Sequence, residues 1–387
     1  MSRRPIDLSP DLLRLQNEGY YLEVRGGYLL VRDVPYARAD RTVCRGTLVA
    51  RLDLSGDVAN KPSDHVAYWI GTHPCHADGR RIESISNPSP PQDLGGGLHA
   101  DFLFSAKADY RDYHHKVTTY VGRIAGEAAR LDPDATARTF PADEGAGPFL
   151  YVDTATARAG IGAVNSRLAA LRVAIVGLGG TGSYILDLVA ETAVAEIHLF
   201  DGDVMSQHNA FRAPGAPGIG QLRERPQKVA YFTEVYGRMR RGIVAHDGYL
   251  GDEGLGLLDG LDFVFLCLDR GSAKRLVVER LVANGTPFVE AGLGVTLDDG
   301  QLGGIVRVAT STPDTREAAA RHISYSDGQD AANAYATNIQ VAELNALNAS
   351  LAVMSWKKLH GVYRDSRREH HRGYSIATGE IVTEGAA

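Results

Sequence analysis

Arg172-Val-Ala-Ile-Val-Gly-Leu-Gly-Gly-Thr-Gly182 is the stretch that decides the fold of the chain. An apolar run at residues 172–176 predicts a buried strand, and a helix is expected to follow the glycines through about Ala193. Glycines at such a turn allow a tight bend and close approach of the backbone to a ligand, and a helix N-terminus favours phosphate. The stretch therefore predicts a phosphate-binding loop rather than an unliganded glycine-rich turn.

Strands and helices alternate around this loop. Further strands are expected at residues 196–200, 262–268, 287–290 and 304–309, and helices at residues 226–239, 270–284 and 331–360. Alternation of this kind is typical of a mostly parallel sheet with helices on both faces. We therefore expect an α/β, doubly wound, Rossmann-like domain in the second part of the chain.

The residues beyond the loop bear on which nucleotide it binds. Asp201 ends the second strand, where a carboxylate can bind a ribose, and this fits NAD as well as ATP. Arg212, in His208-Asn-Ala-Phe-Arg212, and Lys228 would add positive charge for a polyphosphate, although each could be a solvated surface cation. Asp269 follows the third strand, where a carboxylate can hold Mg²⁺ against phosphates. Together these residues favour a nucleoside triphosphate.

The first part of the chain has a different pattern of apolar residues. Short apolar runs at residues 28–31, 46–50 and 66–70 are separated by Gly, Pro and Asp, and residues 116–129 have helical spacing. This pattern predicts a smaller α+β domain. A linker rich in Pro, Gly and Asp follows, so we expect domains at residues 1–140 and 153–387 with a linker at 141–152.

Composition excludes several classes of protein. The 387 residues carry 41 Lys and Arg against 47 Asp and Glu, a net charge of −6, which offers neither nucleic acid nor a membrane surface a basic patch. No run of 18 apolar residues occurs, so a cytoplasmic protein is expected. The three cysteines, Cys44, Cys75 and Cys267, form no Cys-x-x-Cys pair, which excludes a four-cysteine zinc ribbon.

One collinear set of residues resembles a known family, the ThiF/MoeB/HesA-type adenylyltransferases, which share the adenylation domain of ubiquitin-activating enzymes. The resemblance extends from about residue 158 to residue 361. It rests on the following motifs: Gly177-Leu-Gly-Gly-Thr-Gly182, Asp201-Gly-Asp203, Asn209-x-x-Arg212, Lys228 and Asp269.

The resemblance implies an activity. ATP and Mg²⁺ would be the cofactors, and the C-terminal carboxylate of a ubiquitin-like protein would attack the α-phosphate to give an acyl-adenylate and pyrophosphate. It also implies site residues: the loop glycines Gly177 and Gly182 at the phosphates, Gly179 and Gly180 leaving room for the α-phosphate and the carboxylate, Asp201 on the ribose, Asn209, Arg212 and Lys228 on the phosphates, and Asp269 on magnesium.

The chain departs from the family pattern in the crossover loop, residues 311–342. Relatives that form a thioester carry a cysteine there, whereas this loop has none and Cys267 lies in an apolar strand. We therefore expect an enzyme that stops at the adenylate or passes it on. An ester on Ser324, Ser326 or Thr337 is the alternative.

Other departures concern the magnesium site and the oligomer. Arg270 follows Asp269 where relatives often have Asn, and the two Cys-x-x-Cys pairs by which many relatives bind zinc are absent. Relatives are usually homodimers in which the partner supplies an arginine. Arg158 is the candidate for that role here.

The N-terminal domain and the C-terminal tail carry weaker signals. Six histidines fall between His65 and His115, with Cys75 among them, and we interpret them as hydrogen-bonded or solvated rather than as zinc ligands. Residues 364–372 are a mixed charge run interpreted as a solvated tail. The fusion resembles bacterial proteins that accompany ubiquitin-like modifiers, so residues 1–150 are expected to recruit such a modifier or a conjugating-enzyme-like partner.

Two other functions remain open at the level of sequence. An NAD-linked oxidoreductase could use the same loop and Asp201. A non-catalytic scaffold could keep the nucleotide fold for binding alone.

Overall fold

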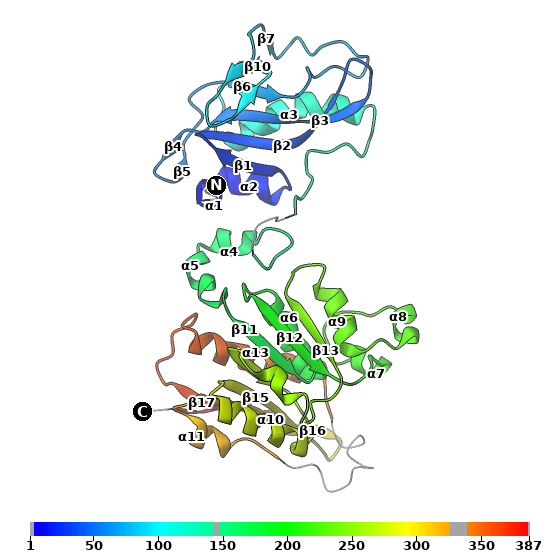
Figure 1. Ribbon diagram of the computed structural model, residues 1–387, viewed down its shortest axis with the longest axis vertical. Coiled ribbons are helices and arrows are strands. Elements are labelled where there is room, and N and C mark those ends of the chain that lie inside the picture. The colour runs from blue at the N-terminus through cyan, green and yellow to red at the C-terminus, as the bar shows by residue number, and fades with distance from the viewer. Residues whose placement is uncertain (1–3, 143–146, 326–338, 386–387) are drawn as a thin grey trace. The chain divides into compact units, whose positions relative to one another are not determined.

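The computed structural model describes residues 4–142, 147–325 and 339–385. The chain divides into two compact units (Figure 1). Unit 1 comprises Met1–Asp143 and Tyr151–Ile161, and unit 2 comprises Glu144–Leu150 and Gly162–Ala387. The sequence predicts domains at residues 1–140 and 153–387 with a linker at 141–152. The observed boundary lies close to that linker, but residues 151–161 group with unit 1.

Unit 1 is a six-stranded antiparallel sheet with the order β1-β2-β3-β6-β10-β7, covered by helices on one face. Its elements are α1 (Arg4–Leu8), α2 (Pro10–Asn17), β1 (Tyr21–Arg25), β2 (Tyr28–Ala37), β3 (Val43–Arg51), β4 (Leu54–Ser55), β5 (Val58–Ala59), β6 (Val66–Ile70), β7 (Ser86–Asn87), β8 (Gln92–Asp93), β9 (His99–Ala100), β10 (Phe102–Ser105), α3 (Tyr113–Ala129) and α4 (Thr154–Ala159).

Helix α3 supplies much of the core of unit 1. The helix begins where the Asp112 carboxylate accepts a hydrogen bond from the His115 N–H at 2.7 Å, an N-cap of the usual kind. Its apolar face packs on β2 and β3, and Tyr113 and Tyr120 are fully buried there with Trp69 of β6. This is the small α+β domain that the apolar runs predict.

Unit 2 is built on an eight-stranded sheet with the order β13-β12-β11-β14-β15-β16-β17-β18. Its elements are α5 (Gly162–Asn165), η1 (Ser166–Leu168), β11 (Arg172–Val176), α6 (Gly180–Ala190), β12 (Glu196–Asp201), α7 (Gln207–Ala210), α8 (Ile219–Glu224), α9 (Lys228–Tyr236), β13 (Ile243–Asp247), η2 (Leu255–Leu258), β14 (Phe263–Leu266), α10 (Gly271–Asn284), β15 (Phe288–Asp298), β16 (Gln301–Ser311), α11 (Arg316–Ala320), α13 (Ala342–Leu359), β17 (Glu369–Ser375) and β18 (Ile381–Gly385).

Both faces of the central strands are buried, because helices cover the sheet on either side (Figure 1). Val173 and Ile175 of β11 pack with residues of α6, α9 and α13, whereas Ala174 and Val176 pack with residues of η2 and α10. Successive side chains on a strand point to opposite faces, which explains why this strand is a continuous apolar run. The expected α/β, doubly wound, Rossmann-like domain is confirmed, and its sheet is mixed, because β11–β15 pair in parallel whereas β15 to β18 pair antiparallel.

The strand order reverses between β11 and β14. From β11 the chain proceeds to β12 and β13 on one side, all parallel, and then crosses to β14 and β15 on the other side. Ligands of doubly wound sheets bind at the carboxyl ends of the strands at such a reversal. The glycine loop after β11 and Asp269 after β14 lie at this edge.

Several expected elements have different bounds. Helix α9 begins at Lys228 rather than Pro226, because Gln227 forms an extended bridge to Val204, and α6 ends at Ala190. The described part of the last long helix begins at Ala342, whereas residues 331–338 lie outside the described ranges.

The interpretation of residues 364–372 as a solvated tail is wrong for its second half. Strand β17 begins at Glu369 and pairs with β16, and Arg372 is 7% exposed. Its guanidinium bonds the Glu369 carboxylate, which also accepts from Lys358 Nζ at 2.8 Å. Because the charges of the run are paired, its backbone can join the sheet.

No helix in the described ranges is long and apolar enough to cross a membrane.

Candidate functional site

Two glycines of the loop after β11 are required by close packing. Gly177 has φ +92°, and a Cβ at this position would lie 2.6 Å from the carbonyl oxygen of Cys267. A Cβ on Gly182 would overlap the carbonyl oxygen of Gly177. These glycines let the loop fold tightly over the end of β14, which places the start of α6 at the reversal point of the sheet.

The two middle glycines differ from each other. Gly179 is the N-cap of α6, and no other group comes within 4 Å of a Cβ built there, so this position leaves room for a ligand. At Gly180 the expected room is absent, because a Cβ would collide with the side-chain amide of Asn345 from α13. The free space for a phosphate or carboxylate therefore lies at Gly179.

Asp201 holds the loop in place. Its Oδ2 accepts a hydrogen bond from the Leu178 N–H at 2.6 Å, and its Oδ1 accepts from the Asp203 N–H at 2.8 Å. Its side chain is 7% exposed. In this structure the carboxylate expected at the ribose also fastens the glycine loop to the end of β12.

Lys228 joins two carboxylates. From the first turn of α9, its Nζ lies 3.3 Å from Asp201 Oδ1 and 2.7 Å from Asp203 Oδ2, and its side chain is 5% exposed. Tyr249 donates from its hydroxyl to Asp203 Oδ1 at 2.5 Å. An ammonium paired with two carboxylates is held in one position, so Lys228 links the start of α9 to the end of β12.

The same contacts shift two pKa values. Burial alone would raise the pKa of Asp203, but the bonds from Lys228 and Tyr249 outweigh it and hold that pKa below its usual range. The bond to the Asp203 carboxylate raises the pKa of Tyr249 to about 12. Asp203 is therefore an anion and Tyr249 a neutral donor at physiological pH.

Asn209 and Arg212 occupy the turn around α7. Asn209 is buried, and its Oδ1 accepts from the Ser206 N–H at 2.9 Å, so the amide caps the helix start. Arg212 is half-buried just past α7, and its carbonyl accepts from Asn345 Nδ2 at 3.3 Å. The neighbouring His208 has a lowered pKa because of its burial and the charges of Arg212 and Lys228.

Asn345 is a site residue that the sequence did not indicate. It is fully buried on α13, where Oδ1 accepts from the Thr181 hydroxyl at 3.1 Å and Nδ2 donates to Arg212. It therefore ties the first turn of α6 to the segment that carries Arg212. Helix α13 carries a second buried asparagine, Asn348, so the residue type alone gives no local signal of this role, and the two bonded partners of Asn345 lie far away along the chain.

The contact between Gly180 and Asn345 is testable by a double-mutant cycle. Gly180→Ala should lower the free energy of unfolding, because the new methyl group displaces a buried, bonded amide. In an Asn345→Ala background the methyl group has space, so the two changes should couple by about 1–3 kcal/mol. Chemical denaturation of the four proteins measures this coupling.

Gly179→Ala is the matched control for the cycle. It adds the same methyl group where space is free, so it should cost only about 0.5–1 kcal/mol, for alanine in place of glycine at an N-cap, and this cost should be the same in the Asn345→Ala background. Additive effects of Gly180→Ala and Asn345→Ala would contradict the contact.

Asp269 differs from the other acidic residues of the site. It is exposed three residues beyond β14, and it makes no hydrogen bond or ion pair with any residue in the described ranges. Arg270, the residue in the position often occupied by Asn, places its guanidinium 5.9 Å from the centre of the Tyr249 ring. A carboxylate with no hydrogen-bond or ion-pair partner among the described residues is a ligand of the kind that magnesium accepts.

Four further candidate residues remain, of which two fall in the described ranges. Arg158 is exposed on α4, in unit 1, so its role at the site stays a prediction. Ser324 is exposed after α11, whereas Ser326 and Thr337 lie outside the described residues.

The environments of Cys267 and Cys75 do not favour a nucleophilic thiolate. Cys267 follows β14 and packs against the core, and burial raises the pKa of its thiol. Cys75 is 2% exposed in unit 1, and burial raises its pKa as well. Because the thiolate is the nucleophile, both environments favour a structural role.

Three histidines of unit 1 are engaged in side-chain hydrogen bonds. His73 Nδ1 bonds the Pro74 carbonyl at 2.8 Å, His76 Nδ1 bonds Glu127 at 3.1 Å, and His114 Nε2 bonds Glu18 at 3.0 Å. Within the described part of unit 1, no three His, Cys, Asp or Glu side chains group as metal ligands.

Comparison with protein families gives two adjoining matches. Residues 10–154 match a domain of unknown function (DUF6791), and residues 155–361 match the ThiF family. The chain belongs to the ThiF family. The resemblance recognised from the glycine loop and the residues after it is therefore confirmed, together with an extra N-terminal domain.

One curated relative is the adenylyltransferase and sulfurtransferase Uba4 of Pyricularia oryzae, which is 32% identical over 139 residues, or 35% of this chain. The matched stretch spans only 27% of the length of that relative.

Solved structures with a similar fold include E. coli MccB with MccA-N7isoASN and PaaA. The first has 17% identity and a TM-score of 0.46, and covers 58% of this ThiF-family chain and 67% of its own. For PaaA the sequence identity is 18% and the TM-score is 0.44, and the match covers 57% of this chain and 66% of PaaA.

Proposed function

We propose that this chain is an ATP-dependent adenylyltransferase that activates the C-terminal carboxylate of a ubiquitin-like protein. Membership of the ThiF family and the local relationship to Uba4 support adenylation. The observation that carries the proposal is the arrangement at the carboxyl ends of β11, β12 and β14. There the open position at Gly179 lies at an edge that also bears the buried ammonium of Lys228 and the Asp269 carboxylate, which has no hydrogen-bond or ion-pair partner among the described residues.

The proposed roles follow from this arrangement. The N–H groups of the first turn of α6 and Lys228 would bind the phosphates, with Arg212 and Asn209 on the same side. Asp201 would bind the ribose while holding the loop, and Asp269 would hold Mg²⁺, which neutralises phosphate charge when bound. Positioning and charge stabilisation are then the main contributions of the protein to the reaction.

The proposed reaction balances without a further reactant. A carboxylate oxygen of the substrate forms a bond to the α-phosphorus of ATP, and the bond from that phosphorus to the oxygen bridging to the β-phosphate breaks. The electron pair leaves with pyrophosphate, and the products are an acyl-adenylate and pyrophosphate. No thiol is needed at this step, in keeping with the buried state of Cys267 and Cys75.

The choice of substrate and partners belongs to the same proposal. Unit 1 would recruit the ubiquitin-like protein or a conjugating-enzyme-like partner, and the chain would act as a homodimer in which Arg158 reaches the partner's site. Light scattering on the full chain and on Arg158→Ala would measure the oligomer independently of activity. A monomeric chain that adenylates its substrate would contradict the dimer while leaving adenylation intact.

The test of substrate chemistry uses two forms of one substrate. A ubiquitin-like protein from a neighbouring gene is incubated with ATP, Mg²⁺ and the full chain, either with its free C-terminus or as the C-terminal amide. We expect mass spectrometry to find an AMP adduct on the free acid alone. An adduct on the amide would place the reaction at another group, and binding without any adduct would favour the scaffold alternative.

A further inference from the structure

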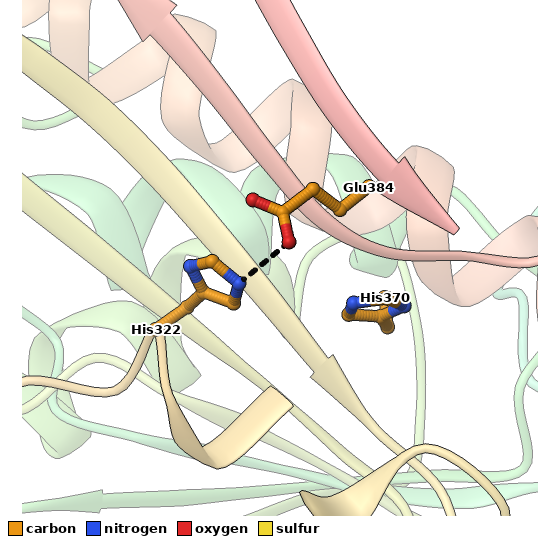
Figure 2. Close-up of side chains that lie close together, drawn as sticks. All are labelled: His322, His370 and Glu384. Atoms are coloured by element: carbon orange, nitrogen blue, oxygen red, sulfur yellow. Dashed lines mark hydrogen bonds and ion pairs between the residues drawn. The ribbon is translucent and has the colours of Figure 1, made fainter. Parts of the chain in front are cut away.

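A group of metal-ligating side chains lies at the antiparallel edge of the sheet in unit 2. His322 follows α11, His370 is on β17, and Glu384 is on β18 (Figure 2). One ligand atom of each residue lies within 4.8 Å of one ligand atom of each of the other two. Among the residues that the structure describes, no other three His, Cys, Asp or Glu side chains come this close.

A β-bulge in β17 explains how two adjacent histidines of this strand both lie near His322. Glu369 pairs with Gly385 and His371 pairs with Glu384, so His370 is an extra residue without a partner on β18. Neighbouring side chains on a regular strand point to opposite faces, and a bulge re-aims one of them. Both rings consequently lie near His322, with centroids 6.3 Å away for His370 and 3.7 Å away for His371.

The contacts within the group already bring two of the ligand atoms together. His322 Nε2 lies 3.2 Å from Glu384 Oε2, the contact drawn as a dashed line in Figure 2. Neighbouring ligand atoms around a tetrahedral zinc ion lie about 3.3 Å apart. His371 stacks on His322, and its Nδ1 lies 3.6 Å from the second carboxylate oxygen, Oε1. His371 thus contacts both His322 and Glu384 without being one of the three ligands.

The site is open enough to exchange an ion and covered enough to hold one. The side chain of His322 is 20% exposed and that of Glu384 is 51% exposed, whereas His371 is 12% exposed. Imidazole nitrogens with a carboxylate oxygen form a donor set that suits zinc and other borderline divalent ions, and suits magnesium or calcium poorly.

We propose that His322, His370 and Glu384 bind a divalent transition-metal ion of the zinc class. Three protein ligands leave a fourth position for water. The ion would connect the segment after α11 to the β17–β18 hairpin. These two parts of unit 2 are far apart in the sequence. Because the ion would bind the folded chain and not the unfolded one, binding should stabilise unit 2.

The test measures zinc binding to the full chain after removal of metal by a chelator. Calorimetry with ZnCl₂ should give one site per chain, and zinc should raise the melting temperature. Loss of a supporting residue around a metal typically costs about 10- to 100-fold in affinity, so His370→Gln and Glu384→Gln should each weaken Kd by about 100-fold or more. His371→Phe keeps the stack and should cost about 10-fold.

Two control variants match the ligand substitutions. Glu380→Gln changes an exposed carboxylate next to the same hairpin, and His99→Gln changes an exposed histidine in unit 1, so both should bind zinc like the parent chain. Melting in the presence of chelator should be alike for all variants, which separates loss of a ligand from failure to fold.

The proposal would be overturned by the absence of a zinc site in the parent chain, or by ligand variants that bind as tightly as the controls. A site lost equally in Glu380→Gln would place the ion elsewhere and also refute the assignment. None of these outcomes depends on adenylation, because the readouts are binding and melting of the chain alone.

Discussion

Asp269→Asn should slow ATP–pyrophosphate exchange by about 10²- to 10³-fold while leaving the protein folded. The carboxylate is exposed and makes no hydrogen bond or ion pair within the described residues, so changing it to an amide should leave the free energy of unfolding nearly unchanged. What it removes is the negative charge proposed to hold magnesium against the phosphates. Exchange rates at saturating ATP, together with the free energy of unfolding, measure the two effects separately.

Asp314→Asn is the matched control, because Asp314 is also an exposed carboxylate in unit 2 but follows β16. It should leave exchange unchanged. Raised magnesium should partly restore exchange in Asp269→Asn and do nothing for the control. If Asp269→Asn exchanged at the parent rate, Asp269 would have no part in the reaction.

Lys228→Met should have two large effects at once. The change removes a buried ammonium from Asp201 and Asp203, and breaking a buried pair from one side costs about 3–5 kcal/mol of the free energy of unfolding. It also removes a cation proposed to bind the phosphates, so exchange should fall by about 10²- to 10³-fold. Denaturation and exchange at a temperature where the variant is folded measure the two losses.

Lys116→Met separates the general cost of losing a buried lysine from the specific one. Lys116 is equally buried in unit 1, where its Nζ lies 2.9 Å from Asp64 Oδ1. Its loss should lower the stability of that unit and leave exchange intact. A Lys228→Met protein that is less stable but exchanges normally would show that Lys228 is structural only.

The strand and loop at the centre of the site could be predicted because their signals are local. Strand β11 covers residues 172–176 as expected, since an apolar run followed by glycines leaves few other conformations. Asp201 could be placed at the end of β12 for the same reason. Two of the loop glycines proved indispensable for packing, which their spacing alone does not reveal.

The remaining parts of the site depend on distant segments. The Thr181–Asn345 hydrogen bond joins residues 164 positions apart. The residues next to Asn345 in the sequence do not indicate that its side chain forms this bond. The paired state of Lys228 likewise depends on how α9 docks against the end of β12. The sequence shows which functional group a side chain carries, but the fold determines whether that group contacts a ligand or another side chain.

Charge runs were the least informative signals. Residues 369–372 are dense in charge and histidine, yet they form part of β17, because strand pairing with β16 and ion pairs with Lys358 and within the run offset the cost of burial. The bulge that gathers His370 and His371 near His322 follows from the register between β17 and β18. Register is a property of two strands together, so neither strand shows it alone.

ATP–pyrophosphate exchange by the full chain, with candidate ubiquitin-like proteins from neighbouring genes, tests adenylation most directly. We predict exchange that requires the free C-terminus of one such protein and collapses in Asp269→Asn and Lys228→Met. ATP binding without exchange for any candidate would contradict adenylation and identify a nucleotide-binding scaffold. Absence of ATP binding, together with binding of NAD, would contradict the nucleotide assignment itself.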